Sequence, residues 1–166
     1  AKDWPSIMTF SEQLYSYIGE SDTKLPNALA QYFYVDKKQY PNGFNLTSLK
    51  FLGQNGVDPV IEIYDGSRSI STASLLQKVD YSIWAYDYDI ALNEQIYFAP
   101  GSSFWVVAKF PAGAKNPLGA GKTSQDNVAQ YSFYSSNNGA TWTQLTEVLK
   151  GSSFEAVSDH LTWAVQ

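Results

Sequence analysis

Hydrophobic and polar residues alternate with a period of two in several parts of the chain. Ile90, Leu92, Ile96 and Phe98 share one parity, and polar residues such as Asn93 occupy the other. Because successive side chains of a β-strand point to opposite faces of a sheet, this pattern is typical of a half-buried strand. Similar alternation recurs in the last residues of the sequence, so we expect strands throughout the chain.

One segment is apolar on both parities. Residues Phe104 to Phe110 carry a single charged side chain, Lys109. A strand that is covered on both faces typically has a continuous run of hydrophobic residues in its sequence. The pattern therefore predicts a central strand here.

A change of hydrophobic phase marks another predicted strand. Phe44 and Leu46 share one parity, whereas Leu49 and Phe51 share the other. An irregularity in the pairing would return all four to a common inward face. We therefore predict a β-bulge near Ser48.

Turn-forming residues separate these segments at short intervals. Their spacing predicts about eight to ten strands. We therefore expect an all-β fold, an antiparallel two-sheet sandwich of jelly-roll-like type. The turn signals are Pro41-Asn42-Gly43, Asn55-Gly56, Asp65-Gly66, Pro100-Gly101, Asn138-Gly139 and Lys150-Gly151.

Three segments are less regular. Ser71 to Val79 and Thr146 to Lys150 fit either a strand or a short helical turn. Pro111 to Asn127 is rich in Gly, Pro and polar residues, and we expect a long loop there.

Length and composition support one folded domain over residues 1–166, which we expect to be excised from a larger exported protein. Apolar residues make up 44% of the 166-residue chain and charged residues 16%, which is enough for a core and too little charge for disorder. The aromatic content of 16% favours sheets over helices. No apolar run approaches the ~20 residues of a membrane-spanning helix, so we expect none.

Charge and reactive residues argue against several functions. A net charge of -5 with the single arginine Arg68 does not fit a nucleic-acid-binding surface. The absence of Cys excludes disulfides and thiol catalysis. The single histidine, His160, directly follows Asp159, and neighbouring strand residues face opposite ways, so this pair does not fit a catalytic triad. We therefore predict that the domain is not an enzyme.

The densest aromatic cluster lies in the sequence YSIWAYDYD. Trp84, Tyr86 and Tyr88 would share one face of a strand and form a platform about 13 Å long at ~3.3 Å per residue. Aromatic faces stack on sugar rings, so this cluster is a candidate ligand-binding surface. The alternative is a tyrosine-rich edge of the sandwich. Asp87 and Asp89 could hold a structural calcium ion together with loop oxygens, or could be solvated acids; no other cofactor is expected.

Residues 135 to 142 read SSNNGATW and resemble the Asp-box hairpin S-x-D-x-G-x-T-W of sialidases and other secreted β-domains. Ser135 and Asn137 can bond the turn, Gly139 can adopt positive φ, and Trp142 can fold over the hairpin. Asn137 replaces the usual Asp, and there is one copy. The single arginine of the chain cannot supply the cluster that clamps a sialidase substrate, so we interpret the motif as a structural hairpin.

Several stretches together resemble the β-sandwich accessory or adhesin-type domains of secreted bacterial surface proteins, as in the C-terminal modules of subtilisin-like proteases. The resemblance covers about residues 28–146. It implies a non-catalytic module, secreted or at the bacterial cell surface, that binds or positions its parent protein. Its expected partners are other domains of the same polypeptide, a glycan or a host or cell-surface protein. The alternatives are a carbohydrate-binding module and, third, a small glycoside hydrolase. The stretches are LAQYFYV, FNLTSLKFLG, VIEIYDG, IYFAPGSSFWVVAKF and YSFYSSNNGATWTQL.

Overall fold

The described residues of the chain form eleven β-strands, and every strand pair among them is antiparallel. Within this part of the chain no helix is long and apolar enough to cross a membrane. The computed structural model describes residues 13–18, 26–52, 60–66, 69–70, 73–80, 87–110, 118–122, 132–137, 139–144 and 161–163.

The largest sheet has six strands, in the order β10-β9-β2-β7-β4-β5. Strand β7 lies inside this sheet, paired with β2 on one side and with β4 on the other. Seven of its eight residues are buried, which confirms the predicted central strand. The six strands are β10 (Thr143–Gln144), β9 (Ser132–Ser135), β2 (Asn27–Tyr34), β7 (Ser103–Phe110), β4 (Val60–Asp65) and β5 (Ser74–Asp80).

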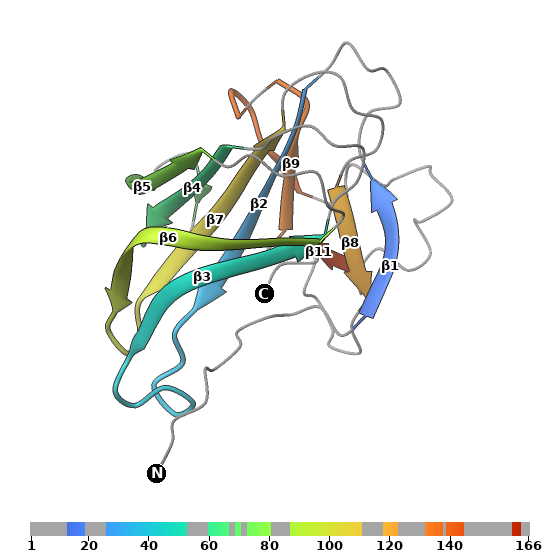
Figure 1. Ribbon diagram of the computed structural model, residues 1–166. Helices are drawn as coiled ribbons and strands as arrows, with labels where there is room; N and C mark the ends of the chain where they lie inside the picture. The colour runs from blue at the N-terminus through green and yellow to red at the C-terminus, as the bar shows by residue number, and fades with distance from the viewer. Residues whose placement is uncertain are drawn as a thin grey trace.

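The second layer consists of two smaller sheets, β3-β6 and β1-β8-β11. Strand β3 contacts β8, so the two sheets adjoin, and β8 and β11 both contact β2 of the large sheet. Figure 1 shows β3 and β6 crossing in front of β2 and β7. The predicted all-β, antiparallel two-sheet sandwich is therefore confirmed. The five strands are β3 (Phe44–Leu52), β6 (Asp87–Phe98), β1 (Gln13–Ile18), β8 (Leu118–Lys122) and β11 (Leu161–Trp163).

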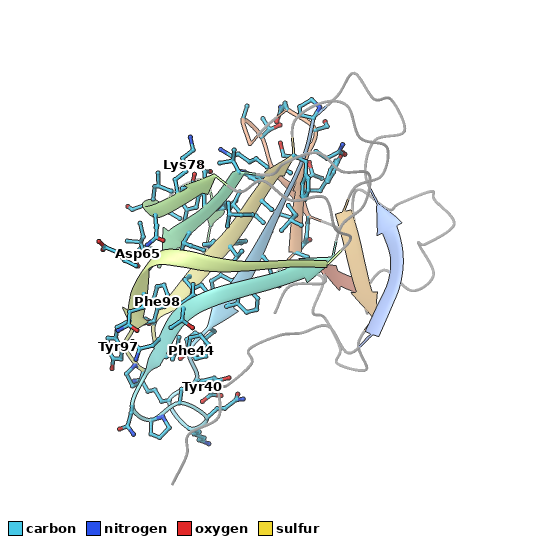
Figure 2. The ribbon with its side chains drawn as sticks, in the orientation of Figure 1. Tyr40, Phe44, Asp65, Lys78, Tyr97 and Phe98 are labelled. Atoms are coloured by element: carbon cyan, nitrogen blue, oxygen red, sulfur yellow. The ribbon has the colours of Figure 1, made fainter. Side chains whose placement is uncertain are left out.

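Four phenylalanines join the two layers. Phe104 of β7 stacks on Phe33 of β2, with ring centroids 5.3 Å apart. From the second layer, Phe98 of β6 and Phe44 of β3 stack on the same ring at 4.3 and 6.5 Å. Figure 2 labels Phe44 and Phe98 at the end of the β3-β6 sheet, next to the large sheet. Such stacked pairs contribute about 0.5–1.5 kcal/mol each beyond area burial, so Phe104 is a central contact of the core.

The pairing of β3 with β6 is interrupted where the sequence predicts a bulge. Leu46 pairs with Ile96, whereas Ser48 pairs with Ala91, so the register shifts between Leu46 and Ser48. The predicted irregularity near Ser48 is confirmed; the side chains of Leu49 and Phe51 lie outside the described ones, so their common inward face stays a prediction. The extra residues lie on β6. There, the side chain of Gln77 on β5 donates a hydrogen bond to the backbone oxygen of Glu94 at 3.0 Å. This bond ties the bulge to the edge strand of the large sheet.

Two of the less regular segments contain strands. Residues 74–80 form β5, which resolves the first ambiguity in favour of a strand. Residues 118–122 form β8, so the prediction of a loop over Pro111 to Asn127 was wrong for these five residues. Gly119 and Gly121 have low strand propensity, but β8 pairs with both β1 and β11, and this tertiary pairing overrides the local preference.

Candidate functional site

The six-stranded sheet has a second face, turned away from β3 and β6. Alternation along β7 places Phe104 on the inner face and Trp105, Val107 and Lys109 on the outer face. Trp105 is completely buried, and the described residues packed around it come from the sheet itself, from the β4–β5 segment and from the β9–β10 hairpin. Its outer-face neighbours are the buried residues Ala30, Tyr32, Ile70 and Val107 and the partly buried Tyr64, Ala73, Phe133 and Trp142.

A buried carboxylate lies on this outer face. Glu62 pairs in register with Val107, and its side chain is 9% exposed. Lys109 Nζ lies 2.8 Å from Glu62 Oε1, and the Tyr64 hydroxyl donates a hydrogen bond to the same oxygen at 2.8 Å. A buried charge needs a partner and hydrogen bonds, and Glu62 has both.

This arrangement changes the titration of Tyr64. Burial of the phenol, its hydrogen bond to Glu62 and the negative charge of that carboxylate raise the pKa of Tyr64 from 10.0 to about 12. Each of these factors disfavours the phenolate. Tyr64 therefore remains a hydrogen-bond donor to Glu62 over the whole neutral range.

The hairpin between β9 and β10 is held by side chains of the SSNNGATW segment. Ser135 Oγ donates to Asn137 Oδ1 at 2.7 Å and accepts from the backbone N–H of Gly139 at 2.9 Å. Asn137 Oδ1 also accepts from the backbone N–H of Thr141 at 3.0 Å, and Asn137 Nδ2 donates to Thr141 Oγ1 at 2.7 Å. These bonds tie both sides of the turn to one amide.

Gly139 brings the hairpin close to the outer face of the sheet. Its φ of 90° lies in the left-handed region, which L side chains rarely adopt. A Cβ atom at this position would lie 3.2 Å from Lys109 Cε and 3.3 Å from Trp142 Cζ2. The turn at Gly139 therefore packs closely against the side chains of Lys109 and Trp142.

A pocket of about 260 Å³ lies between this hairpin and the segment that connects β4 to β5. The sheet contributes Tyr64 and Lys109 to its lining. The lining residues outside the sheet are Ile70 and Ala73 on one side and Gly139, Ala140 and Trp142 on the other.

The pocket combines aromatic surface with polar groups. The ammonium group of Lys109 has three N–H donors, and Glu62 is its one ion-pair partner among the described residues. The indole of Trp142 offers an N–H donor and an aromatic face. Aromatic walls with a few convergent polar groups are typical of small-molecule sites, and a sugar presents the matching apolar face and hydroxyl edge.

The sequence-predicted site residues are distributed unevenly over the described part of the chain. Trp142, predicted as part of a structural hairpin, lines the pocket, and Ser135, Asn137 and Gly139 shape the turn that carries it. The remaining candidates contribute no described side chain. Trp84 and Tyr86 lie outside the described residues, and Asp87, Tyr88 and Asp89 are described as backbone of β6 alone.

Sequence reasoning missed the polar part of the pocket. Glu62 lies among Val60, Ile61 and Ile63, and Lys109 is the one charge in the apolar run from Phe104 to Phe110; the two charges have opposite sign. Two such charges in neighbouring covered strands indicate a buried ion pair. Only the pairing of β4 with β7 shows that they meet.

Comparisons with known proteins support the fold. A scan against protein-family models gave no match, and a search of curated proteins gave none either. Among solved structures, the chain is similar to the crystal structure of the cysteine protease and lectin-like domains of Cwp84, a surface layer associated protein of Clostridium difficile. The TM-score is 0.53 at 14% sequence identity, and the match covers 84% of this chain and 31% of that chain. The chain thus spans less than a third of that structure.

Proposed function

We propose that this domain is a non-catalytic, glycan-binding module of a bacterial surface protein. The observation that carries the proposal is the outer-face pocket, whose lining combines the aromatic residues Trp142 and Tyr64 with Lys109. Saccharides bind through stacking of their C–H faces on aromatic rings and through hydrogen bonds to charged and polar side chains. The pocket supplies both kinds of contact within one small volume.

The structural comparison supports a binding role. The similar structure contains a lectin-like domain and comes from a surface layer associated protein, and the present chain shares an all-β architecture with part of it. Lectins bind sugars without changing them. We propose sugar binding at a cell surface for this domain too, with the outer-face pocket as the binding site.

The polar groups of the pocket fit binding better than hydrolysis. Glycoside hydrolases use two carboxyl groups, about 5–9.5 Å apart, on either side of the scissile bond. The described residues that line the pocket include no Asp or Glu. Glu62, next to it, is held by Lys109 and Tyr64 through one oxygen. We therefore propose that the pocket holds a sugar and leaves its bonds intact.

A glycan array tests this proposal with three proteins. We expect the wild-type domain to bind a subset of glycans, and Trp142→Ala to reduce that binding by about tenfold or more, because one stacking surface is lost. Trp84→Ala is the matched control, since it removes the same side chain from the competing aromatic platform. Binding that survives Trp142→Ala but not Trp84→Ala would move the site to the platform. No glycan binding by the folded wild type would refute the proposed function.

A further inference from the structure

The outer-face pocket is small and is lined by side chains from the hairpin, from the β4–β5 segment and from the sheet. The hairpin residues Gly139, Ala140 and Trp142 lie on one side, Ile70 lies on another, and the sheet contributes the Lys109 side chain. Its volume of about 260 Å³ falls below the ~300–1,000 Å³ of pockets that hold drug-sized ligands. One six-membered ring with its substituents fills such a space, and a run of linked rings does not.

We infer that the pocket binds a single neutral sugar residue at the end of a glycan and not an internal residue of the glycan. This inference rests on the proposed function. An internal residue carries glycosidic bonds on two sides, and each continuing chain needs an exit. A terminal residue needs one exit. A pocket of about 260 Å³ has room for one residue, and a terminal residue fits it with its single continuing chain outside.

The charges beside the pocket favour a neutral ligand. Lys109 Nζ lies 2.8 Å from Glu62 Oε1, so the cation in the lining is already balanced by a carboxylate. Tyr64 donates to this same oxygen, which keeps Glu62 in place. An acidic sugar would bring a second carboxylate close to Glu62, whereas a hydroxyl can accept a hydrogen bond from Lys109 without repulsion.

Chain length separates end-binding from internal binding. We would measure the affinity of the folded domain by isothermal titration calorimetry. The ligands are glucose, galactose, mannose and N-acetylglucosamine, each with its linear homo-oligosaccharides of two to six residues. Each oligosaccharide has one non-reducing end, so we expect the molar affinity to stay constant within about twofold once the pocket is filled. Affinity that rises in step with the number of residues would overturn end-binding and leave the proposed function intact.

Charge preference tests the second part of the inference. We expect glucose to bind more tightly than glucuronic acid to the wild type, and Glu62→Gln to improve the relative affinity for glucuronic acid by about fivefold or more, because the Lys109 cation loses its partner. Asp65→Asn is the matched control: it removes one negative charge from the same strand at an exposed position, labelled in Figure 2. It should leave the preference unchanged.

The outcomes distinguish the two proposals. Tighter wild-type binding of glucuronic acid, or an equal response of Glu62→Gln and Asp65→Asn, would refute the neutral-ligand inference. Both results still require saccharide binding, so they leave the proposed function standing. Absence of binding to every probe, with folding verified by circular dichroism, would refute the proposed function and with it this inference.

Discussion

The two faces of the six-stranded sheet are built from alternate residues of the same strands, but they are covered differently. On the inner face, Phe104 is enclosed by stacked rings from the opposite layer. On the outer face, Trp105 is equally buried, under side chains from a loop and a hairpin. A sheet covers its partner continuously, whereas a loop and a hairpin leave space between them. The pocket lies in that space, next to Lys109.

We expect the largest loss of stability from a substitution in the core on the inner face of the sheet. Phe104→Ala removes a ring that is 1% exposed and stacks on three others, and we expect a loss of about 3–5 kcal/mol in the free energy of unfolding. Denaturant unfolding measures this loss. The exposed Tyr34→Ala, on the neighbouring strand, is the control and should cost far less. A similar loss for both variants would contradict the assigned core.

The ion pair should give the next largest effect. Glu62→Ala leaves Lys109 without its partner, and we expect a loss of about 2–3 kcal/mol, below the ~3–5 kcal/mol seen for fully buried pairs. The loss is smaller because the Lys109 side chain is 22% exposed. Glu62→Gln keeps an acceptor for Tyr64 and should cost less. Equal losses for Glu62→Ala and the exposed Asp65→Ala would show that the pair has no special role.

The hairpin can be tested at its turn. Gly139→Val forces a β-branched residue to φ near 90°, and we expect a loss of about 1–3 kcal/mol from backbone strain. The new side chain would also press on Lys109 and Trp142, so glycan binding should weaken. The adjacent exposed Ala140→Val serves as the stability control, expected within about 0.5 kcal/mol of wild type. A stable Gly139→Val variant with unchanged binding would separate the hairpin from the pocket.

The smallest effect concerns alkaline pH. Because the folded-state pKa of Tyr64 is raised to about 12, the stability that this shift contributes is present below pH 10 and is lost as the pH rises from 10 toward 12. Tyr64→Phe cannot titrate and lacks the bond to Glu62. We expect this variant to be less stable than wild type by about 1 kcal/mol at neutral pH, with the gap narrowing above pH 10. A gap that stays constant to pH 12 would contradict the Tyr64–Glu62 interaction.

Local patterns in the sequence predicted the fold where neighbouring residues determine the structure. The apolar run around Phe104 predicted the central strand, and the phase change near Ser48 predicted the bulge. Strand β8 was missed because Gly119 and Gly121 disfavour strands and are held by two partner strands. These pairings join segments far apart in the sequence, so no local pattern reveals them.

The candidate site was only partly predictable for the same reason. Trp142 was recognisable from the hairpin motif, but its role in a pocket depends on where the hairpin packs. Glu62 and Lys109 come together through the register of β4 and β7, which a single sequence does not specify. The sequence therefore indicated the hairpin and missed Lys109, which lines the pocket with Trp142, and its partner Glu62.

Indole N–H resonances offer the most direct test of where a ligand binds. The chain has five tryptophans, and each signal can be assigned by a single Trp→Phe variant. On titration with the methyl glycosides of glucose, galactose, mannose and N-acetylglucosamine, we expect the Trp142 signal to move with at least one of them. The completely buried Trp105 lies beneath the pocket and should move less, and the Trp84 signal should stay in place. Saturable movement of the Trp84 signal with a fixed Trp142 signal would contradict the outer-face site.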